Sequence, residues 1–176
     1  ICALFYTRKQ FGPWVILGAG LGAVGDFFLW INYEYADPIG VCAFLGGHIA
    51  YSIAFFKDLH CTWTRVATIA VMAIFMITVS VWSSLNTHRS LSSVELTSLS
   101  VYAIIMGIMM AIAILHQSPT WFIAAGAIFF VISDAHIALR HGMPASTRLW
   151  FAFSGYITYY LGQYLLVAGA AYESRV

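Results

Sequence analysis

The chain has 176 residues, of which 61% are hydrophobic and only 9% are charged, and its formal net charge is +1. Soluble domains carry about 45–50% apolar and about 25% charged residues, so this composition excludes a water-soluble enzyme, a disordered tail and a secreted disulfide scaffold. The small net charge and the lack of a basic patch exclude a nucleic-acid-binding protein. An integral membrane protein remains.

Six apolar stretches are each long enough to cross a bilayer as a helix, which takes roughly 20 residues. In chain order they are Trp14–Ile31, Ile39–Phe56, Val66–Leu85, Leu96–Leu115, Trp121–Leu139 and Leu149–Ala170. Short polar breaks separate them, so we expect consecutive helices to be antiparallel neighbours. The sequence therefore predicts an all-α, polytopic transmembrane bundle.

The chain begins with a short apolar segment that resembles the end of an earlier helix. Ile1–Tyr6 is followed by Arg8 and Lys9, with no initiator methionine and no signal peptide before it. We therefore expect a single transmembrane helical domain over residues 1–176 that is truncated at its N-terminus.

The first stretch contains a glycine motif whose usual meaning does not apply here. Residues 20–25 read GLGAVG and match the dinucleotide-binding pattern GxGxxG, which requires a preceding strand. This segment instead lies inside an apolar helix. Gly18 and Gly22 are four residues apart and predict a small-residue face against another helix, within the chain or in a homo-oligomer.

Ionisable residues inside the apolar stretches are few. Asp26 lies in the first stretch, His48 in the second and Asp134 in the fifth. Such groups are costly at membrane depth and therefore indicate function. The last stretch adds polar residues at Tyr156, Tyr159, Tyr160 and Gln163. The third and fourth stretches have no charge in their interiors and are predicted to be scaffold.

The two aspartates are expected at the same depth. Asp26 follows Trp14 by 12 residues, and Asp134 follows Trp121 by 13, so each lies roughly 18–20 Å along its helix. The two helices run in the same direction, because three crossings separate them. A tyrosine follows each aspartate by 25 residues, at Tyr51 and Tyr159, which suggests two related halves meeting at one site.

A pair of intramembrane carboxyl groups supports more than one chemistry. One group can hold a proton while the other is ionised, which supplies an acid and a base for hydrolysis. The same pair could serve a proton-coupled transporter or a lipid carrier, or the polar groups could satisfy one another in a purely structural protein. A metal held by Asp26, His48 and Asp134 is a further alternative, although we expect no metal and no cofactor.

Four segments together resemble the YhhN-like lysoplasmalogenase family. They are residues 22–29 (GAVGDFFL), 40–51 (GVCAFLGGHIAY), 126–134 (GAIFFVISD) and 159–163 (YYLGQ), in the family's order. The resemblance implies an integral membrane hydrolase of about eight helices, of which the first two are absent here. It implies cleavage of the vinyl ether bond of lysoplasmenylcholine or lysoplasmenylethanolamine, with release of a fatty aldehyde and glycerophosphocholine or glycerophosphoethanolamine.

The implied reaction assigns roles to the polar residues. A vinyl ether is hydrolysed by protonation on carbon, capture of the oxocarbenium ion by water, and collapse of the hemiacetal. We expect one of Asp26 and Asp134 to be the acid and the other to activate water, and the sequence leaves open which is which. The residues expected to orient water or stabilise developing charge are His48, Tyr51, Tyr159 and Gln163.

The remaining expectations concern the surroundings of the protein. Arg140 and His141 follow the fifth stretch and are candidates to bind the phosphate headgroup, although loop arginines also serve as helix anchors. The expected partners are a lysophospholipid substrate, the bilayer and, as an open alternative, a second copy of the chain. The resemblance places the protein in the endoplasmic reticulum membrane of a eukaryote or the inner membrane of a bacterium.

Overall fold

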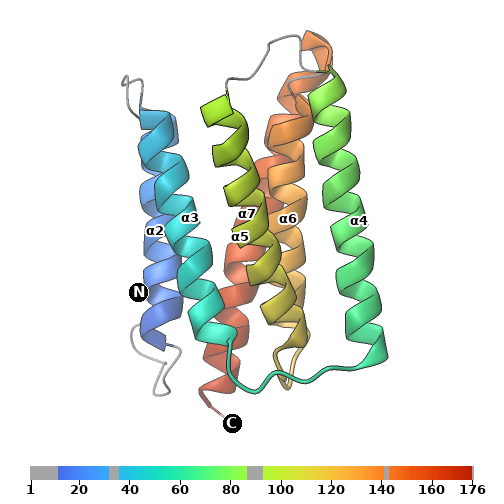
Figure 1. Ribbon diagram of the computed structural model, residues 1–176. Coiled ribbons are helices and arrows are strands. Elements are labelled where there is room, and N and C mark those ends of the chain that lie inside the picture. Colours follow the sequence, from blue (N-terminus) through green and yellow to red (C-terminus); the bar gives the residue numbers. More distant parts are fainter. Residues whose placement is uncertain (1–11, 32–35, 87–92, 141–142, 176) are drawn as a thin grey trace.

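The computed structural model describes residues 12–31, 36–86, 93–140 and 143–175 (Figure 1). These residues form six α-helices and no strand, which confirms the all-α prediction. The helices are α2 (Gly12–Trp30), α3 (Ala36–Phe55), α4 (Trp63–Asn86), α5 (Ser93–Leu115), α6 (Phe122–Arg140) and α7 (Ala145–Glu173). Each predicted apolar stretch lies on one helix and extends beyond it by no more than one residue, while the helices themselves are longer by up to four residues at an end.

Five of the described helices, α2 to α6, are long and apolar enough to cross a membrane. They make the chain an integral membrane protein. The sixth helix, α7, has 29 residues and is amply long, but its tyrosine, glutamine, serine and threonine side chains make it less apolar. Six membrane crossings were predicted, and five of the six helices are apolar enough to confirm the prediction.

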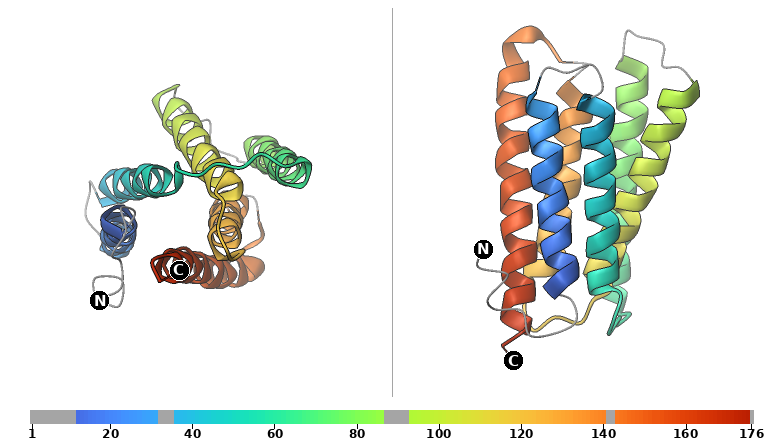
Figure 2. Two further views of the ribbon diagram at one scale, coloured as in Figure 1. Left: turned by 90° about the horizontal axis from the view of Figure 1, so that it is seen from below. Right: turned by 90° about the vertical axis from the view of Figure 1, so that its left-hand side faces the viewer.

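Five helices form a ring, and the sixth lies outside it. Viewed along the bundle axis, α2, α3, α5, α6 and α7 follow one another around the ring, and contacts between α2 and α7 close it (Figure 2). Helix α4 packs on the outside against α5 and α6 and buries none of its residues. Side chains that point into the ring are therefore the candidates for a site.

The glycines of α2 make close helix contacts. A Cβ atom at Gly18 would lie 2.9 Å from the ring of Tyr51, and one at Gly25 would lie 2.7 Å from the ring of Phe44, whereas Gly20 has nothing within 4 Å. Gly18 and Gly25 therefore allow α3 to pack closely. The predicted pair, Gly18 and Gly22, does make close contacts, but with two different helices, because Gly22 faces Gln163 and Tyr159 of α7. This packing confirms that the GxGxxG match is a helix surface.

Helices α6 and α7 also meet through glycine. A Cβ atom at Gly126 would lie 2.9 Å from the carbonyl oxygen of Gly162, and the reverse distance is also 2.9 Å. The two backbones therefore approach without intervening side chains, which increases their van der Waals contact. Such contact is needed because the hydrophobic effect does not drive helices together in lipid. This contact fixes α7 beside α6 and orients its polar residues.

A buried ion pair joins three segments at the end of the bundle where α7 finishes. His116 follows α5 directly, and its Nε2 lies 3.0 Å from the Glu173 carboxylate, while its Nδ1 lies 2.8 Å from the Lys57 carbonyl oxygen. Both ring nitrogens face acceptors, which favours the doubly protonated ring. Burial by itself lowers the pKa of His116, but the hydrogen bonds to Glu173 and Lys57 outweigh burial and raise it.

Candidate active site

The first polar cluster lies between α2, α3 and α7. The Tyr51 hydroxyl donates to Gln163 Oε1 at 2.5 Å, and Gln163 Nε2 donates to the Tyr159 hydroxyl oxygen at 3.1 Å. The Tyr159 hydroxyl also lies close enough to the Asp26 carboxyl group to interact with it electrostatically. Tyr51 and Tyr159 are buried, whereas Asp26 is half-buried. We call these four residues the Asp26 cluster.

The glycines of α2 explain why this cluster forms where it does. A Cβ atom at Gly22 would overlap Gln163 Nε2 and lie 2.9 Å from the Tyr159 hydroxyl. The missing side chain therefore leaves the space that these two polar groups occupy. Phe44 packs edge-on against the Tyr159 ring, with centroids 5.8 Å apart, and holds the ring in place.

The second polar cluster lies between α3, α5 and α6. His48 Nε2 is 3.1 Å from the Tyr102 hydroxyl, and this hydroxyl lies close enough to the Asp134 carboxyl group to interact with it electrostatically. Two atoms of this cluster, Asp134 Oδ2 and His48 Nδ1, are buried and have no partner in the described part of the chain. We call these three residues the Asp134 cluster.

The ring of Phe130 separates the two clusters and contacts both. Its centroid lies 5.5 Å from that of His48 and 5.4 Å from that of Tyr159, edge-on in each case. The hydroxyls of Tyr102 and Tyr159 are near enough to interact electrostatically. Among the described residues no hydrogen bond joins the two carboxyl groups, so they occupy neighbouring clusters on either side of one apolar ring.

The structure therefore places the predicted site residues in two groups. Asp26, Tyr51, Tyr159 and Gln163 form one group, and His48 and Asp134 belong to the other. Of the two headgroup candidates, Arg140 ends α6 but its side chain lies outside what the structure describes, as does His141 altogether. The neighbouring polar residues of α7, Tyr156 and Tyr160, are exposed and lie apart from the hydrogen bonds of the Asp26 cluster.

Tyr102 is the site residue that the sequence analysis missed. The fourth stretch was predicted to be scaffold, and that prediction did not foresee that α5 places this hydroxyl beside His48 and near Asp134. A tyrosine carries no formal charge, so a search for ionisable groups in apolar stretches passes over it. The sequence feature that could have pointed to it is the position of Tyr102, a tyrosine inside an otherwise aliphatic stretch.

The two clusters suit acid/base chemistry. Each joins one carboxyl group to a tyrosine hydroxyl inside a ring of apolar helices, where electrostatic interactions are strong because water is scarce. In the described ranges no three histidine, cysteine, aspartate or glutamate side chains come together as a metal site. The alternative of a metal held by Asp26, His48 and Asp134 therefore has no ligand group to support it there.

Comparison with known proteins identifies a family and curated relatives. The model of the YhhN family matches residues 1–170. Curated proteins named "Lysoplasmalogenase" from Mycobacterium bovis and Mycobacterium tuberculosis are each 26% identical over 167 residues, covering 93% of this chain and 62% of the relative. The chain thus spans about three fifths of the length of these relatives. No solved structure matches the chain.

Proposed function

Because the chain belongs to the YhhN family, we propose that it acts as a membrane hydrolase that cleaves the vinyl ether bond of lysoplasmalogens. The observation that carries this proposal is the presence of two carboxyl groups, Asp26 and Asp134, each beside a tyrosine hydroxyl inside one ring of helices. The relatives named "Lysoplasmalogenase" support the choice of substrate. Acid/base hydrolysis requires such a pair of groups.

The proposed reaction consumes one water molecule. A carboxylic acid delivers its proton to the outer carbon of the vinyl ether, which leaves an oxocarbenium ion. The second carboxylate takes a proton from water, whose oxygen bonds to the cationic carbon and forms a hemiacetal. The hemiacetal then gives its hydroxyl proton to the first carboxylate as the bond to the glycerol oxygen breaks, which yields the fatty aldehyde. The second carboxylic acid protonates the glycerol oxygen to give glycerophosphocholine or glycerophosphoethanolamine, and both carboxyl groups return to their starting states.

The surroundings of the two aspartates favour one assignment of roles. Asp134 Oδ2 is buried and has no partner in the described structure, so we assign Asp134 as the acid that delivers the proton. Asp26 is half-buried and adjoins the donors and acceptors of Tyr159 and Gln163. We assign Asp26 as the group that activates water.

The other polar residues have supporting roles in this scheme. Tyr51 fixes the amide of Gln163 by donating to its oxygen, and the amide in turn fixes the Tyr159 hydroxyl. His48 holds the Tyr102 hydroxyl beside Asp134. Such positioning lowers the barrier because the reacting groups are already oriented when the substrate binds.

The headgroup of the substrate would lie at the end of the bundle where α2 and α6 finish. The vinyl ether oxygen is bonded directly to glycerol, so the phosphate is only a few bonds from the reacting carbon. Arg140 and His141, at the end of α6, are our candidates to bind it. The bacterial relatives favour the inner membrane as the location of this protein.

The test uses the purified full-length protein in detergent with three lysolipids of equal chain length. We expect aldehyde release from the 1-alkenyl lysophospholipid and no product from the 1-alkyl ether, which cannot form the oxocarbenium ion by protonation. A 1-acyl lysolipid serves as the control for general lipase activity. Release that is indifferent to EDTA supports acid/base catalysis. Folded protein that releases no aldehyde but moves the lipid between vesicles would establish the transporter instead.

A further inference from the structure

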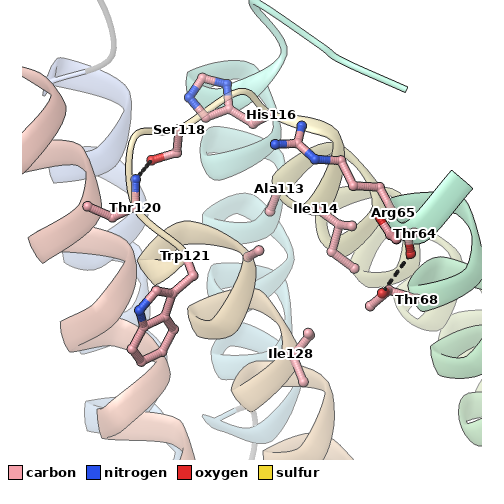
Figure 3. Close-up of a pocket in the computed structure, with 11 residues that line it drawn as sticks. Thr64, Arg65, Thr68, Ala113, Ile114, His116, Ser118, Thr120, Trp121 and Ile128 are labelled. Atoms are coloured by element: carbon pink, nitrogen blue, oxygen red, sulfur yellow. Dashed lines mark hydrogen bonds between the residues drawn. The ribbon is translucent and has the colours of Figure 1, made fainter. Parts of the chain in front are cut away.

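A pocket of about 240 Å³ lies at the end of the bundle opposite the headgroup candidates. It is formed where α4 and α6 begin and where α5 finishes, and Figure 3 shows its lining residues. None of the residues of the Asp26 or Asp134 clusters lines it. Its polar lining residues are Thr64, Arg65, Thr68, His116, Ser118 and Thr120.

Arg65 gives this pocket a positive charge. Its Nη1 donates to the Leu115 carbonyl at 2.6 Å and to the His60 carbonyl at 3.2 Å, so the guanidinium group is held at the pocket. Within the described structure these bonds use Nη1 alone, and Nε and Nη2 are available to a ligand. The nearby Glu173 carboxylate is paired with His116 and is not a lining residue, so the cation is not neutralised.

The rest of the lining suits an anion. Helices α4 and α6 both begin here, at Trp63 and Phe122, and the N-terminal ends of helices attract negative charge. The Thr120 hydroxyl oxygen is buried and has no hydrogen-bond partner in the described ranges. A buried hydroxyl without a partner is costly, and a ligand oxygen in the pocket would satisfy it.

We propose that this pocket binds the phosphate group of a membrane phospholipid. A guanidinium group, hydroxyl donors and two helix N-termini form the set of contacts that phosphate prefers. Ile114 and Ile128 form the apolar part of the pocket wall, and the neighbouring Trp121 is 66% exposed. These side chains offer a surface to the glycerol and the first methylene groups of a lipid.

This lipid is distinct from the substrate of the proposed hydrolase. Trp121 in the pocket and Asp134 in the site are separated by 13 residues of α6, or about 20 Å along the helix. In a lysoplasmalogen the phosphate is only a few bonds from the vinyl ether. A single molecule therefore cannot place its phosphate at Arg65 and its vinyl ether at Asp134.

In the experiment, the full-length protein in detergent is titrated with dioleoyl phosphatidylglycerol, and native mass spectrometry measures the amount of lipid bound at each step. We expect saturable binding of one phosphatidylglycerol and none of dioleoylglycerol, which has the same chains without phosphate. Arg65→Gln should weaken binding by about tenfold or more, the usual effect of losing a charge-assisted hydrogen bond. Arg148→Gln, an exposed arginine at the opposite end, should bind as the wild type does.

A second variant separates binding from folding. Thr120→Val keeps the shape of the side chain and removes a hydroxyl without a partner, so the melting temperature should be unchanged or raised, while phosphatidylglycerol binding falls severalfold. Equal binding by Arg65→Gln and the wild type, or by dioleoylglycerol and phosphatidylglycerol, would overturn the proposal. So would unchanged binding by Thr120→Val. Displacement of the lipid by inorganic phosphate at similar concentrations would identify the ligand as the free anion and overturn the lipid assignment.

Discussion

The Asp26 and Asp134 clusters contain similar groups in different states of hydrogen bonding. In the Asp26 cluster hydrogen bonds run from Tyr51 through Gln163 to Tyr159, whose hydroxyl lies near the carboxyl group. In the Asp134 cluster one carboxyl oxygen and one imidazole nitrogen are buried without described partners. A satisfied network holds its members in fixed positions, whereas unpartnered atoms are available to a substrate.

We propose that this difference corresponds to a division of labour between the two carboxyl groups. The connected cluster has the donors and acceptors needed to hold a water molecule, and the unconnected one has a free oxygen for proton delivery. Chemically similar residues can thus take different roles because their neighbours differ. The following predictions test this division, from the largest expected effect to the smallest.

Removing either carboxylic acid should have the largest effect. We expect Asp134→Asn to lower kcat for aldehyde release by about a thousandfold and Asp26→Asn by about a hundredfold or more, as for the loss of a general acid or base. Asp58→Asn is the matched control, because Asp58 is exposed and its φ of 54° suits asparagine. If either site variant kept the wild-type kcat, its carboxyl group would have no part in the reaction.

Removing one hydroxyl from each cluster should distinguish activity from stability. Tyr159→Phe removes the hydroxyl between Gln163 and Asp26, and we expect kcat to fall by about 10–100-fold. The melting temperature should change little, because Asp26 and Gln163 are only half-buried and water can replace the lost hydroxyl, whereas His48 is buried. Tyr102→Phe leaves both His48 and Asp134 with a lost partner, so it should also destabilise the fold by about 1–3 kcal/mol.

The control for both tyrosine variants is Tyr164→Phe, which alters an exposed ring of α7. Enzyme kinetics and thermal denaturation in the same detergent give the two quantities. If Tyr102→Phe and Tyr159→Phe had the same kcat and the same melting temperature, the distinction between the clusters would be contradicted.

Adding one methyl group should disturb the Asp26 cluster alone. In Gly22→Ala the new Cβ atom would overlap Gln163 Nε2, so we expect the amide to move and kcat to fall by about tenfold, as for one lost hydrogen bond. Gly20→Ala has open space around it and should retain activity with equal or higher stability. A Gly22→Ala enzyme as active as Gly20→Ala would show that the Gln163 contacts are dispensable.

The smallest effect should come from the ion pair of His116 and Glu173, which lies outside both clusters. Folding raises the pKa of His116. The ion pair therefore stabilises the fold fully at a pH below the pKa of unfolded histidine, about 6.5, and this stabilisation is lost as the pH rises through the pKa of folded His116. We expect the melting temperature of the wild type to fall slightly on alkalinisation relative to His116→Gln. His60→Gln, in the neighbouring loop, should behave as the wild type. If the melting temperatures of the wild type, His116→Gln and His60→Gln depended on pH in the same way, the ion pair would not contribute to stability.

The sequence predicts the helices well because bilayer crossing imposes both length and apolarity, and each apolar stretch became one helix. It also selects Asp26, His48 and Asp134 as candidates, since charge at membrane depth is rare, and the structure places them in the two neighbouring clusters. It does not reveal Tyr102, whose contribution depends on α5 packing beside α3 and α6. The division of the site into two clusters depends on Phe130, and an apolar ring among apolar residues gives no signal of that position.

The closure of the ring has a consequence for biogenesis. Helices α2 and α3, and likewise α6 and α7, are joined by short connections and pack closely, so each pair can form soon after insertion. The contact between α2 and α7 joins the two most distant segments of the described chain, and closing long loops is entropically slow. Tyr51 of α3 reaches Gln163 of α7, and Asp26 of α2 lies near Tyr159 of α7, only when the ring has closed. We therefore expect the Asp26 cluster to be completed last, so that an unfinished chain lacks this part of the proposed catalytic site.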